Sequence, residues 1–430
     1  MRELTISGHR IADSEPPFIV AEVGSNHQGS VETAKLLFRA AADCGVQAVK
    51  LQKRDNRTLY TPAFYNAPYN SQHAFGPTYG AHREALEFDF EQYTELKAYA
   101  ESLGLVFFAT AFDIPSADFL HRLGVPAFKV ASGDLTNTPL LVELARYRVP
   151  LIISTGGGTF EDVQRARRAI WPIDGQGADS PSFAFLQCTA AYPCEAHEMN
   201  LRVIETYRSA CPNIVIGLSD HQSGIAMGPV AFALGARIFE KHFTLNRTWK
   251  GSDQAFSLEP VGMRKYVRDL KRVREALGDG VKRVYESERA PIRKMAKSPY
   301  AHGTLDEGTM VQPGFLDLRS PADGLPAWKA DKFYGCVMGE TVLSGDVLDS
   351  TGVLEPLLHA PIASNSSVLN AISWLPDPVV SGHPWIEQDS SGERPWWMVP
   401  YDKRVEERHY ITATLKHSHW WERVWERLTG

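Results

Sequence analysis

Residues 214–244 read IVIGLSDHQSGIAMGPVAFALGARIFEKHFT, and this stretch decides the fold. Two short apolar strands, 214–221 and 237–244, flank an amphipathic run that continues through Leu234. Each strand closes on a polar cluster that holds a histidine, His221 in the first and His242 in the second. Because a strand, a helix and a second strand form a parallel pair, both imidazoles are expected at the same end of one sheet.

The same unit recurs along the chain from Pro17 onward. In the first helical segment, Ser30 precedes a run whose apolar residues share one face before Gly45, and Thr159 with Asp162 forms a capping-box pattern before another helix. Strands alternating with helices predict a parallel sheet covered by helices, and eight units favour a (β/α)₈ TIM barrel over an open doubly wound sheet. The eight apolar runs are 18–24, 48–52, 105–110, 127–133, 151–156, 183–189, 214–221 and 237–244.

Polar or small side chains stand at the end of every predicted strand. The active site of a barrel lies at the carboxyl ends of its strands, so this distribution predicts a catalytic barrel. The strand-end residues are Glu22, Asn26, His27, Lys50, Gln52, Thr110, Lys129, Ser132, Asp134, Ser154, Thr155, Thr189, Ser219, Asp220, His221, Glu240, Lys241 and His242.

The chain exceeds the ~250–300 residues at which a single core stops growing, which predicts more than one domain. We expect a barrel domain over residues 1–280, a charged linker over 281–297 and a compact, mostly β domain over 298–354. Residues 355–430 form an extension of unknown role that holds seven of the ten tryptophans: Trp374, Trp385, Trp396, Trp397, Trp420, Trp421 and Trp425. These tryptophans either pack the extension onto the barrel or its partner subunit, the interpretation we favour, or stack on sugars.

The composition is that of a globular protein that acts on small molecules. The hydrophobic fraction is 43%, no run is long enough for a membrane span, and the N-terminus MRELTISGHR lacks the apolar core of a signal peptide, which predicts a cytoplasmic location. The net charge of −6 and the scattered basic residues argue against a nucleic-acid partner. The five cysteines are expected to be reduced, although Cys188 and Cys194 are close enough in sequence to pair.

The histidines and lysines at the strand ends suggest two kinds of chemistry. His221 and His242 either hydrogen-bond the rim of the barrel or share a metal ion. In the second case Glu22 or Asp253 would be an oxygen ligand of the ion or a hydrogen-bond partner of one of its ligands. A buried ammonium at Lys50 or Lys129 is costly without an anion, which predicts an anionic substrate. The neighbouring hydroxyl side chains and the glycines at 156–158 would add donors for a phosphate group, although the triple glycine is also an ordinary turn.

Nine motifs in order resemble the sialic acid synthase family, whose members condense phosphoenolpyruvate with N-acetylmannosamine or a related amino-sugar aldehyde. The resemblance runs from about Pro17 to Leu354, because residues 298–354 also resemble that family's antifreeze-like (SAF) domain. The motifs are AEVGSNHQG, VKLQ, FATAFD, KVASGDLTN, ISTGG, LQCTAAYP, IGLSDH, FEKHFT and SDQAFSLEP.

The resemblance implies a role for each matching residue. His221 and His242 would hold Mn²⁺ or another divalent metal that polarises the aldehyde as a Lewis acid. Glu22 would handle protons, with Gln52, Asp134 and Asp253 near the sugar. Arg319 would reach from the small domain of one subunit over the sugar site of the other, which implies a domain-swapped homodimer. The residues that would bind phosphoenolpyruvate are Lys50, Thr110, Lys129, Ser132, Ser154, Tyr192 and Ser219.

Four departures from the family pattern put the identity of the sugar in question. Ala190, Ser252 and Gln254 replace more usual residues, and the R-P-G pattern of the small domain reads Arg319-Ser320-Pro321. The alternatives to N-acetylmannosamine are a legionaminic or pseudaminic acid precursor and a sugar of a specialised metabolite. A non-catalytic barrel that binds glycan through the tryptophan-rich extension is the alternative from another class.

Overall fold

The computed structural model describes residues 2–174, 181–348 and 353–354. The chain divides into two compact units, Met1–Arg283 and Val284–Gly430. The tryptophan-rich extension predicted over residues 355–430 lies outside the described residues.

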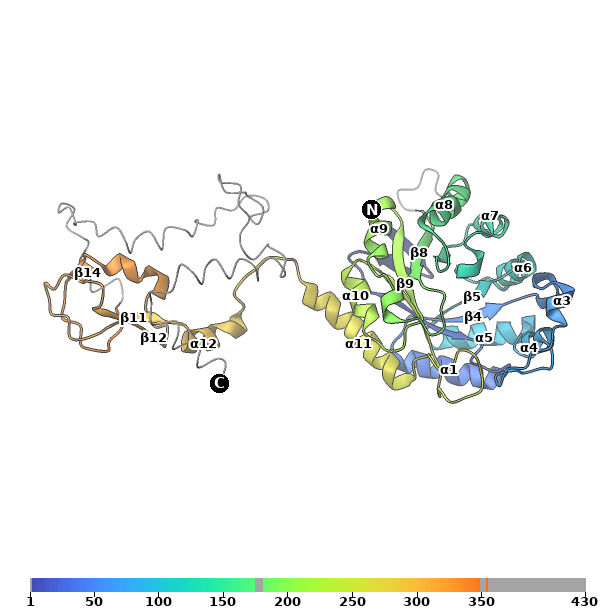
Figure 1. The fold of residues 1–430 in the computed structure, drawn as a ribbon, viewed down its shortest axis with the longest axis horizontal. Coiled ribbons are helices and arrows are strands. Elements are labelled where there is room, and N and C mark those ends of the chain that lie inside the picture. Colours follow the sequence, from blue (N-terminus) through green and yellow to red (C-terminus); the bar gives the residue numbers. More distant parts are fainter. Residues whose placement is uncertain (1, 175–180, 349–352, 355–430) are drawn as a thin grey trace, which may run out of the picture. The chain divides into compact units, whose positions relative to one another are not determined.

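The first unit is a closed barrel of eight parallel strands surrounded by helices (Figure 1), which confirms the predicted (β/α)₈ fold. The barrel closes where the last strand pairs with the first, so that Ile238 lies opposite Phe18 in a parallel register. Every strand is fully or almost fully buried, which explains why each reads as a continuous apolar run. The strands, in their order around the barrel, are β3 (Phe18–Gly24), β4 (Ala48–Lys53), β5 (Val106–Ala111), β6 (Phe128–Val130), β7 (Leu151–Ser154), β8 (Phe183–Cys188), β9 (Val215–Asp220) and β10 (Ile238–His242).

The helices follow the strands in the alternation that the sequence predicts. Three of them, α2, α3 and α4, are short and lie in one long segment between β4 and α5. The helices of the first unit are α1 (Val31–Cys44), α2 (Asn56–Leu59), α3 (Pro62–Tyr65), α4 (Tyr79–Glu84), α5 (Phe90–Ser102), α6 (Ile114–Leu123), α7 (Thr138–Arg146), α8 (Phe160–Asp174), α9 (Val203–Ala210), α10 (Met227–Ala233) and α11 (Pro260–Leu277), with 3-10 turns η1 (Ser132–Asp134) and η2 (Ala196–Glu198).

The predicted ends of α1 and α8 are confirmed by their hydrogen bonds. The Ser30 side chain accepts from the backbone N–H of Thr33, and Gly45 ends α1 in the left-handed region at φ 83°. The backbone N–H of Thr159 donates to the Asp162 carboxylate at 2.8 Å. The caps fix the first residues of the helices, α1 at Val31 after β3 ends at Gly24, and α8 at Phe160 after β7 ends at Ser154.

The register of the barrel sets the polar strand ends side by side. Glu22 of β3 lies opposite Lys50 of β4 and opposite His242 of β10. Thr110 of β5 lies opposite Lys129 of β6, and Ser219 of β9 lies opposite Glu240 of β10. One polar ring therefore lines the carboxyl end of the barrel.

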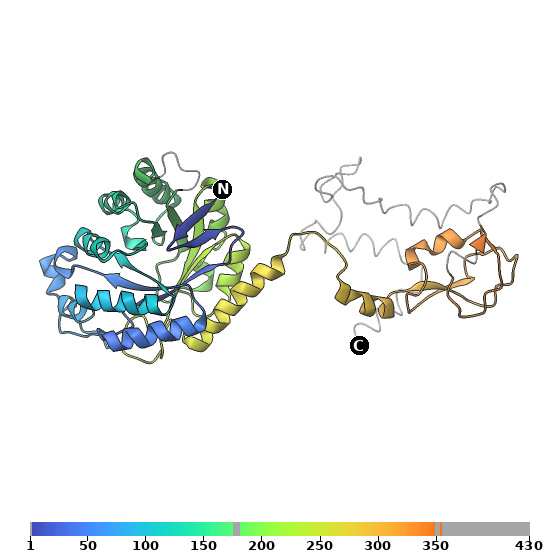
Figure 2. The same cartoon turned by 180° about the vertical axis from the view of Figure 1, so that it is seen from behind.

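A hairpin of β1 (Glu3–Ile6) and β2 (His9–Ala12) precedes the barrel and was not predicted from the sequence (Figure 2). Its two strands are only four residues long, and the residues at its turn, Ser7 and Gly8, both have positive φ. Arg2, directly before β1, donates to the carbonyl of Ile214 at 2.8 Å and so links the hairpin to the amino end of β9. Its apolar residues Ile6 and Ile11 join the barrel core.

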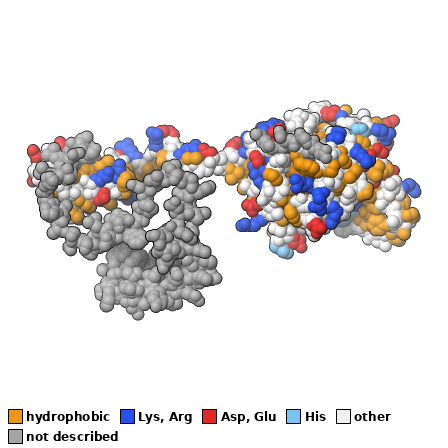
Figure 3. All heavy atoms as spheres, turned by 90° about the horizontal axis from the view of Figure 1, so that it is seen from above, with side chains coloured by type: hydrophobic (Ala, Val, Ile, Leu, Met, Phe, Trp, Pro, Cys, Tyr) orange, Lys and Arg blue, Asp and Glu red, His pale blue; other side chains and the backbone are white. Residues whose placement is uncertain are grey.

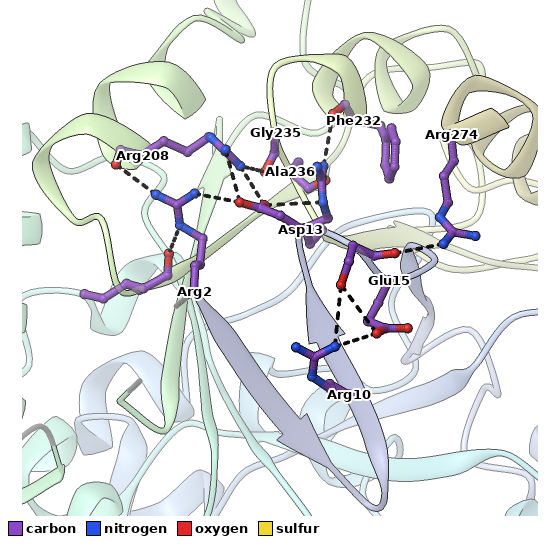
Figure 4. Close-up of polar contacts among 12 residues, drawn as sticks. Arg2, Arg10, Asp13, Glu15, Arg208, Phe232, Gly235, Ala236 and Arg274 are labelled. Atoms are coloured by element: carbon purple, nitrogen blue, oxygen red, sulfur yellow. Dashed lines mark hydrogen bonds and ion pairs between the residues drawn. The ribbon is translucent and has the colours of Figure 1, made fainter. Parts of the chain in front are cut away.

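Asp13, just after the hairpin, holds a cluster of arginines together (Figure 4). Its carboxylate lies 3.2 Å from Arg2, 2.9 Å from Arg208 and 3.5 Å from Arg237. The charges of the arginines outweigh the effect of burial and hold the pKa of Asp13 below its ordinary value. One carboxylate thus ties the hairpin to α9 and to the start of β10.

We expect Asp13→Ala to lower the free energy of unfolding by about 1–2 kcal/mol, because three arginines lose their shared anion at a half-exposed site. Chemical denaturation of the full-length protein measures this loss. Glu3→Ala, which removes an exposed ion pair with Arg10, is the matched control and is expected to change stability by less than about 1 kcal/mol. An equal loss in the two variants would contradict the anchoring role of Asp13.

The second unit holds a small core and short strands. Its elements are α12 (Glu286–Met295), β11 (Ser298–Ala301), β12 (Leu316–Arg319), the 3-10 helix η3 (Ala327–Phe333), β13 (Val337–Met338) and β14 (Val353–Leu354). A buried cluster forms around Leu305, Val311 and Phe333. Gly308, Gly314 and Gly345 all have positive φ. Its likeness to an antifreeze-like domain stays a prediction, as do the exact domain boundaries.

The segment predicted as a linker carries the helix α12. None of the residues of α12 is buried, so no face of this helix is fully covered by the described residues. Charged side chains of both signs gave this segment its linker-like composition, while i,i+3 pairs such as Glu286 with Arg289 suit a solvated helix.

Within the described part of the chain, no helix is both long and apolar enough to cross a membrane. Basic and acidic side chains are interspersed over the face of the barrel seen in Figure 3. The cytoplasmic location stays a prediction.

Candidate active site

One cavity of about 670 Å³ opens at the carboxyl ends of the barrel strands. It brings together every predicted site residue of the barrel domain. Arg319 alone lies elsewhere, in the second unit. The predicted residues that line the cavity are Glu22, Lys50, Gln52, Thr110, Lys129, Ser132, Asp134, Ser154, Tyr192, Ser219, His221, His242 and Asp253.

Two lysines and two glutamates form a buried charge cluster at the floor of the cavity. The Lys50 ammonium lies 2.7 Å from the Glu22 carboxylate and 3.8 Å from that of Glu240. Lys129 lies 3.9 Å from Glu240. Lys50 and Glu22 are only 2% and 1% exposed, so their charges interact with little screening by water.

This cluster corrects the argument that only a substrate anion would compensate the lysines. Glu22 was predicted as a proton carrier, and Glu240 was noted only as a strand-end residue, yet both are ion-pair partners of the lysines. The compensating carboxylates come from other strands: β3 pairs with β4 and places Glu22 beside Lys50, and closure of the barrel through β10 adds Glu240.

The two carboxyl groups of the cluster have pKa values that are shifted in opposite directions. Burial is the largest cause that raises the pKa of Glu22 to about 7, against the opposing effect of Lys50. Burial would also raise the pKa of Glu240, but Lys129 and Lys50 outweigh it and hold it below its ordinary value. Burial lowers the pKa of Lys129. Glu22 is therefore the carboxyl group of this pair that can exchange a proton near neutral pH.

Neutral donors surround the lysines. Lys50 donates to the Thr110 hydroxyl at 2.7 Å, and Lys129 donates to the Ser154 hydroxyl at 2.6 Å. The backbone N–H of Gly156 donates to the Ser132 hydroxyl at 3.0 Å. Ammonium, hydroxyl and backbone N–H groups at one side of the cavity form a donor set that suits a phosphate group.

Gly156 is a point where backbone and side chains approach too closely for a methyl group. A Cβ at this position would lie 2.8 Å from the Ser132 hydroxyl and 2.9 Å from the backbone nitrogen of Ala190. The glycine run predicted as an anion cradle thus serves close packing at its first member.

We expect Gly156→Ala to lower kcat/KM by about 10- to 100-fold and the free energy of unfolding by about 1–3 kcal/mol, because the Ser132 side chain and the backbone at Ala190 must move away from the new methyl group. Steady-state phosphate release and thermal unfolding measure the two effects. Gly133→Ala is the matched control for stability, because a Cβ there meets nothing within 4 Å and its φ is negative. Unchanged kinetics in Gly156→Ala would contradict this account.

The two histidines pack against each other and against two aromatic side chains. Their ring centroids are 5.3 Å apart, and Tyr192 lies 4.3 Å from His221 while Phe256 lies 4.9 Å from His242. Burial, with the neighbouring His242 as the second cause, lowers the pKa of His221 to about 4. Burial also lowers the pKa of His242. Both rings are therefore neutral at pH 7, the form that binds metal ions.

The hydrogen bonds of the two imidazoles fit metal ligation. The Nδ1 atom of His221 lies 3.0 Å from the carbonyl of Thr189, which orients the ring and leaves Nε2 for a ligand. The Nδ1 atom of His242 is buried without a hydrogen-bond partner, and the nearest Asp253 carboxylate oxygen is 3.9 Å away. Among the described residues no group of three or more histidine, cysteine, aspartate or glutamate side chains is arranged to hold a metal ion. The two neutral imidazoles are thus the side chains that would hold a divalent ion at this site.

A hydrogen-bonded row runs from the charge cluster toward the cavity mouth. Gln52 donates to Glu22 at 2.8 Å and accepts from Arg54 at 2.6 Å. Gln52 thus sets the orientation of the Glu22 carboxylate.

Two further carboxylates of the predicted site have neighbouring donors. Asp134 accepts from Asn137 at 3.0 Å, and Ser252 donates to Asp253 at 2.7 Å.

Besides Ser252, six polar or aromatic residues that line the cavity were not among the predicted site residues, namely Arg54, Tyr60, Tyr79, Arg83, Phe112 and Glu240, of which Glu240 was noted only as a strand-end residue. Two of them carry a signal in the alternation of their strands, because Arg54 shares the parity of Lys50 and Gln52, and Glu240 shares that of His242. Tyr60, Tyr79 and Arg83 lie on or between the short helices α2 to α4, where no strand pattern indicates which side chains face the cavity.

Of the residues that depart from the family pattern, Ala190 and Ser252 line the cavity. Gln254 is buried outside the cavity lining, where its side chain accepts from the Thr244 hydroxyl and donates to the carbonyl of Asn26 at 3.2 Å. Gln254 therefore holds the loop after β10 to the end of β3. Arg319 lies on β12, 58% exposed and paired with Asp317.

The comparisons with known proteins agree with this geometry. A model of the NeuB family matches residues 37–282. The N-acetylneuraminate-9-phosphate synthase of Homo sapiens is 40% identical over 73% of this chain and 85% of its own length. The N,N'-diacetyllegionaminic acid synthase of Campylobacter jejuni is 32% identical over 74% of this chain and 94% of its own length.

A solved structure gives the same result for the fold. The N-acetylneuraminic acid synthetase of Leptospira borgpetersenii, in complex with citrate, superposes with a TM-score of 0.57 at 32% identity, over 68% of this chain and 95% of that one. The chain therefore belongs to the NeuB family and is an enzyme of the sialic acid synthase type.

Proposed function

We propose that this enzyme condenses phosphoenolpyruvate with an amino-sugar aldehyde, N-acetylmannosamine or a related sugar, to give a nonulosonic acid and inorganic phosphate. The observation that carries the proposal is the single cavity in which a cationic, hydroxyl-rich side faces two neutral histidines. The names of the relatives support the reaction class. They differ in the sugar and in whether the product carries a phosphate, so the exact sugar is left to experiment.

Phosphoenolpyruvate would bind at the side that holds Lys50 and Lys129. Their ammonium groups would contact its negatively charged oxygens, while Thr110, Ser132, Ser154, Ser219 and Tyr192 would add neutral donors or packing. The buried ion pairs keep both lysines in place before the substrate arrives. Such preorganised charges stabilise a transition state without a cost of reorganisation at the moment of reaction.

His221 and His242 would hold Mn²⁺ or another divalent cation, which would polarise the aldehyde of the sugar as a Lewis acid. The neutral state of both rings and the unpaired Nδ1 of His242 support this assignment. Asp253 and Asp134 would contact the hydroxyl groups of the sugar.

The reaction forms one carbon–carbon bond and breaks one carbon–oxygen bond. The C2–C3 π electrons of phosphoenolpyruvate form the bond from C3 to the aldehyde carbon, and the aldehyde oxygen takes up a proton. Water adds to C2 and loses one proton, which leaves a hydroxyl group on C2. The bond from C2 to the bridging oxygen then breaks, phosphate leaves with that oxygen, and the C2 hydroxyl group gives its proton to the departing phosphate as C2 becomes a ketone. Glu22, whose pKa of about 7 suits both directions of transfer, would exchange these protons while Gln52 holds its carboxylate.

Release of inorganic phosphate tests the proposal. With Mn²⁺, phosphoenolpyruvate and an amino-sugar aldehyde, we expect the wild type to release phosphate and His221→Ala to release none above background. A panel of aldoses with mass-spectrometric detection identifies the sugar. If no aldose yields phosphate above the His221→Ala control, the condensation is wrong. Glycan binding in calorimetry that survives His242→Ala would then support a binding module.

We also propose a homodimer in which Arg319 of one subunit completes the site of the other. The exposure of Arg319, together with exposed apolar side chains such as Leu318 and Trp328 in the same unit, supports a surface that is covered in an assembly. Light scattering that shows a monomer with full activity at micromolar concentration would contradict it.

Mixed dimers test the exchange of Arg319 directly. We expect Arg319→Ala and His221→Ala to be inactive alone, and an equal mixture to regain about one quarter of the wild-type activity after subunit exchange. The reason is that each mixed dimer has one barrel with His221 that receives an intact Arg319. A mixture that stays inactive after exchange would show that Arg319 acts on its own barrel.

A further inference from the structure

Asp253, which would contact the sugar, stands on a loop of residues 245–257 between β10 and α11, called here the Asp253 loop. Its carboxylate lies 3.9 Å from Nδ1 of His242. A Cβ built on Gly24 would lie 3.4 Å from that carboxylate and 3.1 Å from that of Glu22, so both acids approach the same point of β3. The loop must hold its place, because a displacement of about 1 Å near reacting groups can cost about 100-fold in rate.

The half of the Asp253 loop that follows Asp253 is held by buried groups. At its base, the backbone N–H of Leu258 donates to the carbonyl of His242 at 2.8 Å. The Asn26 side chain donates to the Ser257 hydroxyl at 3.0 Å, and that hydroxyl donates to the carbonyl of Asp253 at 2.5 Å. These bonds tie this half of the loop to the ends of β3 and β10.

The half that precedes Asp253 is held at a single peptide group. The Gln28 side chain donates to the carbonyl of Lys250 at 2.7 Å, and the backbone N–H of Gly251 donates to Nδ1 of His73 at 3.2 Å. This carbonyl and this N–H belong to the same peptide group, so both of its polar atoms have a side-chain partner. Gly251 has φ 149°, a conformation in which a side chain would be strained. We call this arrangement the Lys250–Gly251 clamp.

The two clamping side chains come from segments far from the loop in sequence. His73 lies between α3 and α4, and close to it the Lys250 ammonium stands 4.7 Å from the ring centroid of Phe75. Gln28 lies in the turn after β3 with φ 57°, in the left-handed region that is unfavourable for a residue with a side chain. A strained residue is kept where its surroundings require it, and here its side chain reaches the clamped carbonyl.

The clamp acts on the cavity from outside it. Neither His73 nor Gln28 lines the cavity, so neither contacts a substrate bound there. Ser252, the next residue after the clamped peptide group, does line the cavity and donates to the Asp253 carboxylate at 2.7 Å. The clamp is therefore two residues along the chain from the carboxylate that faces the sugar.

We propose that His73 and Gln28 are positioning residues for the sugar, because they hold the Lys250–Gly251 peptide group and thereby fix Ser252 and Asp253 at the cavity. The inference rests on the proposed condensation and adds to it two residues that act on the sugar through the loop. Phosphoenolpyruvate binding, at the side of the lysines, does not depend on the clamp.

Steady-state kinetics with the aldose identified by phosphate release test this role. In His73→Leu, which lacks the acceptor for the Gly251 N–H, we expect the KM for the aldose to rise about 5- to 20-fold and the KM for phosphoenolpyruvate to stay within about twofold. Gln28→Met, which lacks the donor, should behave alike. His73→Asn carries Oδ1 near the position of Nδ1 and should restore the KM to within about threefold of wild type. His197→Leu, at an exposed histidine of η2, is the matched control and should equal the wild type.

Limited proteolysis of the full-length protein measures the clamp without any substrate. Trypsin cleaves after lysine, and the bond after Lys250 is the clamped peptide group itself. We expect cleavage there, followed by mass spectrometry, to be about 5- to 20-fold faster in His73→Leu and Gln28→Met than in the wild type, because cleavage follows the population of the opened loop. Cleavage after Lys282, in the exposed segment at the end of the first unit, is the internal reference and should be equal in all variants.

Two results would overturn the inference. Equal cleavage after Lys250 in the wild type and in His73→Leu would show that the clamp does not hold the loop. Faster cleavage with an unchanged KM for the aldose, or with an equal rise in both KM values, would show that the loop does not position the sugar. If the wild type releases no phosphate with any aldose, the condensation itself fails, whereas the rate of cleavage after Lys250 still decides whether the clamp exists.

Discussion

Lys50→Met is expected to lower kcat/KM by about 100- to 1,000-fold and the free energy of unfolding by about 3–5 kcal/mol. The catalytic loss arises because a preorganised cation leaves the phosphoenolpyruvate side. The loss of stability arises because the Glu22 carboxyl group, 2.7 Å away and 1% exposed, loses the cation that offsets its burial and must take up a proton or remain a buried charge without a partner. Phosphate release and chemical denaturation measure the two quantities.

A second substitution separates these two effects. In Lys50→Met with Glu22→Gln, both charges are gone, so we expect most of the stability to return while activity stays at the level of the single variant. Lys241→Met is the matched control, because Lys241 forms an equally buried pair with Asp220 at 2.8 Å but does not line the cavity. It should lose stability and keep its kcat/KM. A control that loses as much activity as Lys50→Met would show that the catalytic effect is only a consequence of instability.

Glu22→Gln is expected to lower kcat by about 100- to 10,000-fold and to remove the limb of the pH–rate profile near pH 7. The pKa of Glu22 is raised from 4.5 to about 7, chiefly by burial, so the wild type should change its activity as this group loses its proton near neutral pH. The change is measured by profiles of kcat and of kcat/KM that extend about two pH units on each side of pH 7. A variant that keeps both its rate and the limb would assign the proton transfer to another group.

The same raised pKa makes a prediction about stability. Between pH 4.5 and about 7 the folded state holds a proton on Glu22 that the unfolded state has released. The stabilising contribution of this group is therefore full below pH 4.5 and is lost as the pH rises toward 7, by an amount on the order of 3 kcal/mol. Glu22→Gln should lack that part of the pH dependence in denaturant titrations. Glu87→Gln, at another buried carboxyl group that lies outside the cavity lining, should retain it.

The strands and most of the helices were predictable because their signals are local. Each barrel strand is a buried apolar run, and the observed strand ends lie within three residues of the predicted ones, the largest difference being at β6, where the chain turns into η1 at Ser132. Helix starts were predictable where a side chain caps its own helix, as Ser30 does for α1. The β1–β2 hairpin was missed because its strands are short and are stabilised by contacts with distant residues such as Ile214.

The sequence predicted which residues line the candidate site better than it predicted the contacts among them. A barrel collects the carboxyl ends of its strands at one face, so residues at these ends were expected to line one cavity, and those of the barrel domain do. Arg54 and Arg83 were missed because tertiary contacts direct their guanidinium groups, with Arg54 against the ring of Phe112 after β5 and Arg83 against the hydroxyl of Tyr79 on α4.

The amino-acid sequence by itself determined the alternation of strands and helices, and with it the order in which His221, His242 and the lysines enter one face of a barrel. Only the tertiary structure decided which charges meet. Glu22 and Glu240 lie 28 and 190 residues from Lys50 along the chain, yet closure of the barrel places both carboxylates within 3.8 Å of its ammonium. Ion pairs act over a few ångströms, whereas sequence patterns report only which side of its own element a residue faces.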